Sequence, residues 1–201
     1  MFKHKLLSPQ HAPSNGKTIV IIERWLHSNL LHHIGKRYLE SRGFTVYLVS
    51  HILSKGSFES SAQRLKDFID SKQLHDFTLV GVSSGGISAL LYLEKLDGWS
   101  NVKNFVSVAT PFGGTAFALP IAIIKPCREI LPWNKTIKKI QSTLLKHPEK
   151  MLCIVALVDE FVPRKSAILP NVKTKEIDVI GHNALHLTNT ETYKTISEVA
   201  L

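Results

Sequence analysis

The sequence predicts an α/β fold: a doubly wound, mostly parallel sheet of about six strands with helices on both faces. Short apolar runs rich in β-branched residues alternate with amphipathic segments of helical spacing through most of the 201 residues, which is typical of βαβ units. A chain of this length is also large enough for one sizeable core, so we expect a single domain over 1–201. Ligands of such sheets bind beyond the carboxyl ends of the strands.

The elements follow one another in a regular order. Residues 1–16 are polar and contain prolines, which predicts a loose lead-in. The predicted strands are 17–22, 44–49, 77–80, 102–108, 151–158 and 176–180. The predicted helices are marked by Leu30, Leu31, Ile34 and Tyr38, by Ala62, Leu65, Phe68 and Ile69 with Ser60 or Ser61 as cap, by Ile87, Leu90 and Leu91, and by the segment 190–200.

Residues 116–150 interrupt this alternation. The segment contains four prolines, and its later part carries Ile137, Ile140 and Leu144 at helical spacing. Seven Lys or Arg and two Glu lie between 125 and 150, an excess of five positive charges. This excess is more than half of the formal net charge of +9. Such a segment is either a lid-like, membrane-facing insertion or a crossover helix with a solvated basic face.

Composition restricts the class of protein. Hydrophobic residues make up 44% and charged residues 20%, as in soluble globular proteins, and no run reaches the roughly 18 apolar residues of a membrane span. The apolar run after the basic start is too short for a signal peptide, which predicts a cytoplasmic protein. Cys127 and Cys153 lack metal-like spacing and are expected to be free thiols.

The excess of positive charge favours anionic partners. The chain has no zinc-finger spacing and no RNP-like motif, so nucleic acid is not an expected partner. Peripheral contact with an anionic membrane stays open. The oligomeric state is not predicted by anything in the sequence.

A candidate nucleophile follows the third predicted strand. Gly81-Val-Ser-Ser-Gly85 is a G-x-S-x-G pattern between a strand and a helix, the context in which a sharp turn presents a serine hydroxyl above a sheet. Ser83 has glycine at both required offsets, and the Ser84 N–H at the start of the helix would be one oxyanion donor. The alternative, a phosphate-binding turn, lacks the glycine and lysine spacing of known phosphate loops.

Two further strand ends supply the partners that a nucleophilic serine needs. Asp159 follows the fifth strand and His182 follows the sixth, so the chain order is Ser, Asp, His with each residue at a carboxyl end. Glu160 is the competing acid, and His186 is the competing base. Each residue taken alone would suggest a turn or surface side chain, so the combination carries the prediction.

Four segments together resemble the compact bacterial α/β-hydrolase lipases and esterases, of the triacylglycerol-lipase or glycosylphosphatidylinositol-deacylase-like kind. The segments are Phe77 to Gly86, Val106 to Ala116, Asp159-Glu-Phe-Val-Pro163, and Gly181-His-Asn-Ala-Leu185 followed by Thr190 to Ile196. The resemblance covers most of the chain from Ile19 onward. It implies an α/β-hydrolase fold with a small lid, and a Ser83–Asp159–His182 triad that cleaves acyl esters without a cofactor or metal.

One segment departs from these relatives. They usually carry His-Gly after the first strand, where this chain has Glu23-Arg24 followed by Trp25. By position, the Trp25 N–H would be the second oxyanion donor, and losing such a donor costs about 3 kcal/mol of transition-state stabilisation. Arg24, Phe112 (where histidine is common) and Leu119 are the tentative contacts of the substrate pocket.

The sequence therefore predicts a carboxylic-ester hydrolase that forms an acyl-enzyme on Ser83 and acts on a small-molecule or lipid-like ester. A thioesterase or an acyltransferase uses the same residues and stays open. The unusual Glu23-Arg24 segment also favours an alternative of a different class, a catalytically weak binding protein that keeps the hydrolase fold. The acyl length and the alcohol part of the ester are not predicted.

Overall fold

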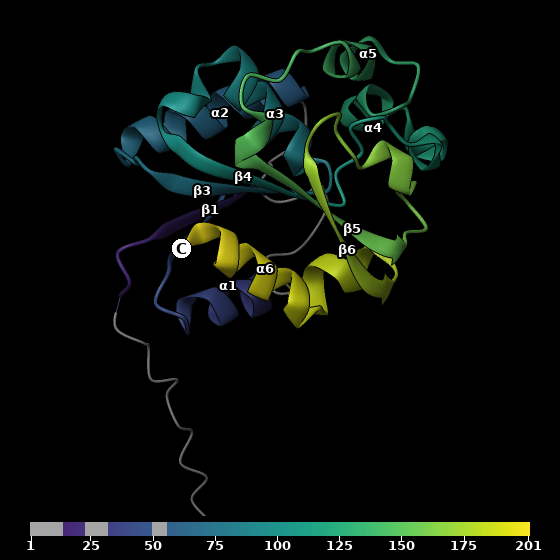
Figure 1. Cartoon of the computed structure of the whole chain (residues 1–201). Coiled ribbons are helices and arrows are strands. Elements are labelled where there is room, and N and C mark those ends of the chain that lie inside the picture. The colour runs from purple at the N-terminus through teal and green to yellow at the C-terminus, as the bar shows by residue number, and fades with distance from the viewer. Residues whose placement is uncertain (1–13, 23–31, 50–55) are drawn as a thin grey trace, which may run out of the picture.

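The computed structural model describes residues 14–22, 32–49 and 56–201. Its centre is a six-stranded sheet in the order β2-β1-β3-β4-β5-β6, and every neighbouring pair is parallel. This confirms the predicted doubly wound sheet (Figure 1). The strands are β1 (Thr18–Ile22), β2 (Thr45–Val49), β3 (Phe77–Val82), β4 (Val102–Val108), β5 (Met151–Val158) and β6 (Lys173–Ile180).

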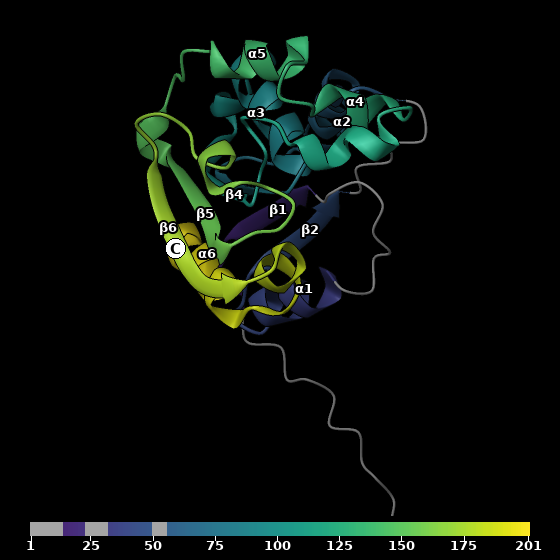
Figure 2. The ribbon, with the colours of Figure 1, turned by 90° about the vertical axis from the view of Figure 1, so that its right-hand side faces the viewer.

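Helices cover both faces of the sheet, as Figures 1 and 2 show. One face packs against α2, α3 and α5, and the other packs against α1 and α6. Strand residues alternate between the two cores, so that Val20 faces one core and Ile21 the other. The helices are α1 (His32–Glu40), α2 (Phe58–Ser71), α3 (Gly85–Lys95), α4 (Lys125–Glu129), α5 (Lys135–Gln141) and α6 (Thr190–Ala200).

The strand order places the carboxyl ends of β3, β5 and β6 along one edge. From β1 the chain first adds β2 on one side and then returns to add β3 on the other. Parallel sheets bind ligands at the point where the winding reverses, which here lies next to the end of β3. Ser83 follows β3 directly at this point.

Three predicted boundaries were wrong by three residues or more. Helix α2 is capped by Ser57, whose hydroxyl accepts from the Ser60 N–H while Ser60 Oγ accepts from the Ser57 N–H. Strand β6 begins at Lys173, three residues early, because its exposed start is polar and shows no apolar pattern. Helix α5 buries Ile137 and Ile140 but ends at Gln141, so Leu144 lies outside it and is 91% exposed.

The segment between β4 and β5 contains the short 3₁₀ helix η2 (Ala116–Ile121), then α4 and α5. A side-chain contact ties it to the body of the protein: Glu129 Oε2 accepts from the Phe58 N–H at the start of α2, at 3.0 Å. A carboxylate at a helix N-terminus is favourable because it meets unpaired N–H groups there. The segment is therefore anchored at α4, and η2 is left beside the edge that carries Ser83.

Candidate active site

Ser83 stands on a sharp turn between β3 and α3. Its φ angle is +51°, in the left-handed region that costs a residue with a Cβ about 1 kcal/mol or more. The Ser83 N–H donates to the Val108 carbonyl oxygen at 2.8 Å, which ties the turn to the end of β4. The strained turn is thus held in place by the neighbouring strand, as expected for a nucleophile turn.

Two glycines make this turn possible. A Cβ on Gly81 would lie 2.4 Å from the Gly86 Cα, and a Cβ on Gly86 would lie 2.0 Å from Thr110 Oγ1. Strand, helix and the segment after β4 therefore pack without room for a side chain. The motif predicts a small residue at Gly81, but only the tertiary contact with Thr110 requires one at Gly86.

We expect Gly86→Ala to lower the free energy of unfolding by about 1–3 kcal/mol, because Thr110 or the start of α3 must move. Urea denaturation measures the change. Ser88→Ala is a matched control on the same helix: its buried hydroxyl has no hydrogen-bond partner within the described ranges, so its loss should change stability by less than about 0.5 kcal/mol. Equal stability of the two variants would contradict the tight contact.

Asp159 begins the loop after β5 and uses both carboxylate oxygens. Its Oδ1 accepts from the N–H groups of Phe161 and Val162, at 2.9 and 2.8 Å. Its Oδ2 lies 2.7 Å from Nδ1 of His182, and the side chain is only 5% exposed. The two backbone bonds orient the carboxylate and leave Oδ2 to the histidine.

His182 connects the acid to the serine. Its Nε2 lies 2.9 Å from Ser83 Oγ, and the ring is almost fully buried. Because a carboxylate only accepts hydrogen bonds, Nδ1 carries the proton and Nε2 accepts from the Ser83 hydroxyl. The rings of Phe161 and His186 pack edge-on against the imidazole, with centroids 5.7 and 5.1 Å away. His182, rather than its rival His186, is thus the histidine bonded to Ser83.

Glu160, the rival acid in the sequence, has a different place. Its Oε2 accepts from the backbone N–H of His182 at 2.8 Å, whereas Asp159 holds the ring. The two adjacent carboxylates therefore bind the backbone and the side chain of the same histidine. Glu160 is a positioning residue, which the sequence alone did not distinguish from a competing acid.

We expect Glu160→Ala to lower kcat about tenfold, because the imidazole loses one of its two anchors and small displacements of a base are costly. Glu160→Gln keeps an acceptor oxygen and should recover most of that loss. Rates of ester hydrolysis by the two variants provide the measurement, with circular dichroism as the folding control. If glutamine and alanine lower kcat equally, the hydrogen bond to the His182 N–H does not position the ring.

The predicted oxyanion donors have different outcomes. Ser84 lies at the start of α3 and lines the same pocket as Ser83, where the positive end of a helix favours developing negative charge. Trp25 and the tentative pocket residue Arg24 lie outside the described residues. Of the two predicted oxyanion donors, only Ser84 is therefore among the described residues.

A pocket of about 260 Å³ opens over Ser83 and His182. Its walls are mostly apolar and come from η2, α4 and the loop after β5. Besides Ser83, Ser84 and His182, the lining residues are Pro111, Thr115, Phe117, Ala118, Ile121, Cys127, Ile130, Phe161 and Val162. Burial raises the pKa of the Cys127 thiol to about 11, so this thiol stays protonated near neutral pH and does not compete with Ser83 as a nucleophile.

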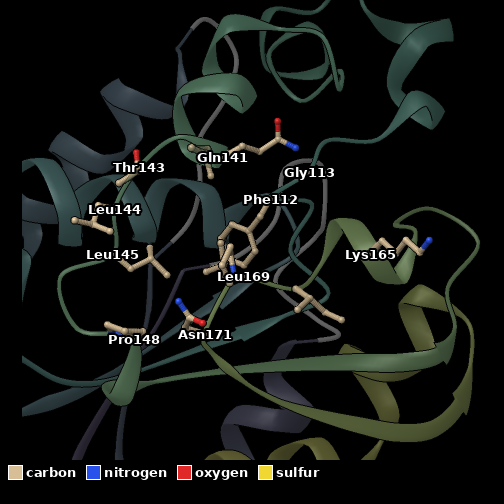
Figure 3. A pocket seen from close by; sticks show the side chains of 13 residues that line it. Phe112, Gly113, Gln141, Thr143, Leu144, Leu145, Pro148, Lys165, Leu169 and Asn171 are labelled. Carbon is tan, nitrogen blue, oxygen red and sulfur yellow. The ribbon is translucent and has the colours of Figure 1, made fainter.

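The two remaining predicted pocket residues were wrong. Phe112 is 1% exposed and lines a separate cavity together with Gly113, the next residue of the tight turn that begins at Pro111 (Figure 3). Leu119 is 54% exposed and does not line the pocket, whereas Ala118 and Ile121 do. A 3₁₀ helix has three residues per turn, so positions 118 and 121 share a face that position 119 does not.

Other residues of the pocket over Ser83 were not predicted from the sequence. Phe117 and Phe161 come from segments 44 residues apart, yet their rings meet edge to face with centroids 6.0 Å apart. Thr115 Oγ1 donates to the Phe161 carbonyl oxygen at 2.5 Å and holds the two segments together. The position of Phe161, two residues after the predicted acid Asp159, could have indicated an aromatic pocket wall. Nothing in the sequence pairs Phe161 with Phe117.

This arrangement can transfer a proton over a fixed path. A 2.9 Å hydrogen bond joins Ser83 Oγ to His182 Nε2, so that the Ser83 proton could pass to the imidazole, and the Asp159 carboxylate is placed to stabilise an imidazolium. Little water reaches the acid and the base because both are buried. Within the described residues, no group of three or more His, Cys, Asp or Glu is placed to hold a metal ion.

Solved structures share this architecture. Bacillus licheniformis lipase BlEst2 in its mature form superposes with a TM-score of 0.76 at 14% identity, over 96% of both chains. MGS-MChE2, an α/β-hydrolase enzyme from the metagenome of lagoon sediments at Mar Chica, Morocco, reaches 0.66 at 22% identity over 92% of this chain and 91% of its own. The chain has the α/β-hydrolase fold.

Sequence comparison adds nothing to this α/β-hydrolase assignment, since no protein-family model and no curated protein matches the chain. The monoacylglycerol lipase of Paleococcus ferrophilus has the same fold, with a TM-score of 0.64 at 14% identity over 94% of this chain and 95% of its own. At such identities the likeness concerns the fold. None of the described helices is long and apolar enough to cross a membrane.

Proposed function

We propose that this α/β-hydrolase-fold protein is a serine hydrolase that cleaves carboxylic esters. The observation that supports this most directly is the unbroken hydrogen-bond chain from Ser83 Oγ through His182 to Asp159, with lengths of 2.9 and 2.7 Å. Its serine sits in a strained turn at the N-terminus of a helix. The three groups and the helix end together supply a nucleophile, a base, an orienting acid and an oxyanion donor.

The proposed reaction proceeds in two halves. His182 Nε2 takes the Ser83 proton as Oγ attacks the acyl carbon, and the carbonyl oxygen becomes an oxyanion near the Ser84 N–H. The imidazolium then returns the proton to the leaving alcohol, which departs and leaves an acyl-enzyme. In the second half His182 removes a proton from water, the water oxygen attacks the acyl carbon, and Ser83 regains its proton as the acid is released.

The pocket walls favour an ester with an apolar acyl part. The rings of Phe117 and Phe161 and the side chain of Ile121 line the pocket and are also partly open to solvent, at 62%, 42% and 44% exposure. An alkyl chain placed against them would remove this apolar surface from water, which is favourable in proportion to the area covered. A lipid-like ester fits this rim better than a charged one. Contact with an anionic membrane stays a prediction.

A fluorophosphonate probe tests the proposal, because such probes phosphonylate an activated serine. We expect labelling of the wild-type protein and no labelling of Ser83→Ala. In parallel, p-nitrophenyl esters of increasing acyl length should show rising kcat/KM from acetate to a medium chain as the apolar wall is filled, by up to about tenfold for each methylene group that is fully buried. Equal labelling of both proteins would remove the proposal, whereas a flat chain-length profile would remove only its lipid-like substrate.

A further inference from the structure

A second and larger cavity, of about 370 Å³, is lined by Phe112 and Gly113 of the turn that begins at Pro111. Its volume is within the range of small-molecule sites. The end of α5 and the segment up to 148 contribute lining residues, and so does the segment 165–171 (Figure 3). The lining residues are Phe112, Gly113, Ile140, Gln141, Thr143, Leu144, Leu145, Pro148, Lys165, Ile168, Leu169, Pro170 and Asn171.

The lining of this cavity is mostly apolar, and its charge is positive. Figure 3 shows the Phe112 ring at the centre, with Leu144 and Leu145 to one side and Lys165 at the opposite end. Most of the other lining side chains are aliphatic, and the remaining polar ones are neutral. Among the described residues that line it, one carries a positive charge and none is a carboxylate.

The cation is also uncompensated. The neighbouring Arg164 is paired with Glu176 at 2.6 Å, but no carboxylate within the described ranges forms an ion pair with the exposed Lys165. The adjoining segment 135–150 contains five lysines and a single glutamate, Glu149. Its charge adds a positive potential at the cavity, which attracts anions.

One apolar side chain at the cavity is poorly covered. Leu144 is 91% exposed although it belongs to the lining, because α5 ends before it. A single exposed apolar side chain is common on protein surfaces, but Leu144 also belongs to the lining of this cavity and continues its apolar side. A ligand with an apolar part would cover Leu144 and the Phe112 side of the cavity together.

We propose that this cavity binds an anionic amphiphile, an alkyl chain that carries a carboxylate. The chain would lie against Phe112, Leu144 and Leu169, and the carboxylate would meet Lys165 at the rim. The absence of a lining carboxylate and the basic neighbouring segment select against a cationic head on the same tail. The binding itself does not depend on ester hydrolysis at Ser83.

The position of the cavity gives such binding a consequence. Its wall is bonded to the active-site loop: the Gly113 N–H donates to the Ser166 carbonyl oxygen at 2.8 Å, and Ser166 Oγ donates to the Gly114 carbonyl oxygen at 2.5 Å. Residues 161–166 thus connect the loop that begins at Asp159 to the lining of the second cavity. If the proposed function is right, the ligand has the chemistry of the acid that the hydrolysis releases, and the cavity is placed to sense product.

Calorimetric titration of the full-length protein with decanoate, below its micellar concentration, tests the proposal without any ester. We expect saturable binding with a Kd below about 1 mM. Leu144→Glu removes an apolar contact and places a negative charge at the cavity, and it should raise the Kd at least about tenfold. Leu144→Lys removes the same apolar contact but adds a cation, so it should raise the Kd less than Leu144→Glu does. Both substitutions are at a position that is already 91% exposed, so folding is not at risk.

Two further comparisons complete the test. Lys165→Gln should raise the Kd about threefold or more, while Lys72→Gln, on an exposed lysine at the end of α2, should leave it unchanged. Decyltrimethylammonium, with the same tail and a positive head, should bind more weakly than decanoate. The proposal is overturned if decanoate does not bind, if Leu144→Glu and Lys165→Gln leave its Kd unchanged, or if both head groups bind equally. These outcomes are independent of whether Ser83 labels with fluorophosphonate.

Discussion

Ser83→Ala should lower kcat for ester hydrolysis by about 10⁴-fold or more, with the fold unchanged. The substitution removes the oxygen that forms the acyl-enzyme in the proposed reaction, and neither His182 nor Asp159 can replace it. Alanine occupies the same left-handed backbone at the same cost as serine, so stability should be little affected. The measurement is kcat with a p-nitrophenyl ester of medium acyl length, together with the urea midpoint of the variant.

The adjacent serine provides the matched control. Ser84→Ala keeps the backbone N–H that we assign to the oxyanion site, and loses only a hydroxyl that the proposed reaction does not use. Its kcat should stay within about threefold of wild type. If instead Ser84→Ala abolishes hydrolysis and Ser83→Ala does not, the nucleophile has been assigned to the wrong residue of the turn.

Asp159→Asn should lower kcat by about 10⁴-fold. The reason lies in the two backbone bonds to Oδ1: the N–H groups of Phe161 and Val162 require an acceptor there. The asparagine must then direct its NH₂ group at His182 Nδ1, which has to be unprotonated to accept. The imidazole is forced into the tautomer with its proton on Nε2, and Nε2 can no longer accept the Ser83 proton.

Glu160→Gln is the control for this prediction, because it neutralises the neighbouring carboxylate while it keeps an acceptor for the His182 N–H. We expect a loss of less than about tenfold. Steady-state kinetics of the two variants under identical conditions separate the roles. The assignment of acid and positioning residue is reversed if Glu160→Gln is the inactive variant and Asp159→Asn keeps most of its activity.

Much of the fold could be predicted because strand and helix periodicity are local properties. Buried parallel strands appear as short β-branched runs such as 18–22, and the helices between them carry apolar stripes. The boundaries of elements were predicted wrongly where they are marked by polar residues instead of an apolar pattern. The exposed, polar start of β6 has no pattern to detect, and the true cap of α2, Ser57, is distinguished from its serine neighbours only by its hydrogen bonds.

The residues of the candidate site likewise include some that the sequence could predict and some that it could not. Ser83, Asp159 and His182 were predictable because each follows a strand, and the carboxyl ends of parallel strands share one edge. Phe112 and Leu119 were misplaced because proximity in sequence to that edge does not determine which way a side chain points. The direction depends on a tight turn in one case and on a 3₁₀ helix in the other.

The sequence by itself determined the doubly wound parallel sheet and the three residues that the hydrogen-bond chain joins, since these depend on local pattern and on the order of the elements along the chain. Only the tertiary structure decided the rest. It separated Asp159 from Glu160, required a small residue at Gly86 through Thr110, and placed Phe112 at a different cavity from the one over Ser83. These features arise from contacts between segments far apart in the chain, which no local pattern of residues records.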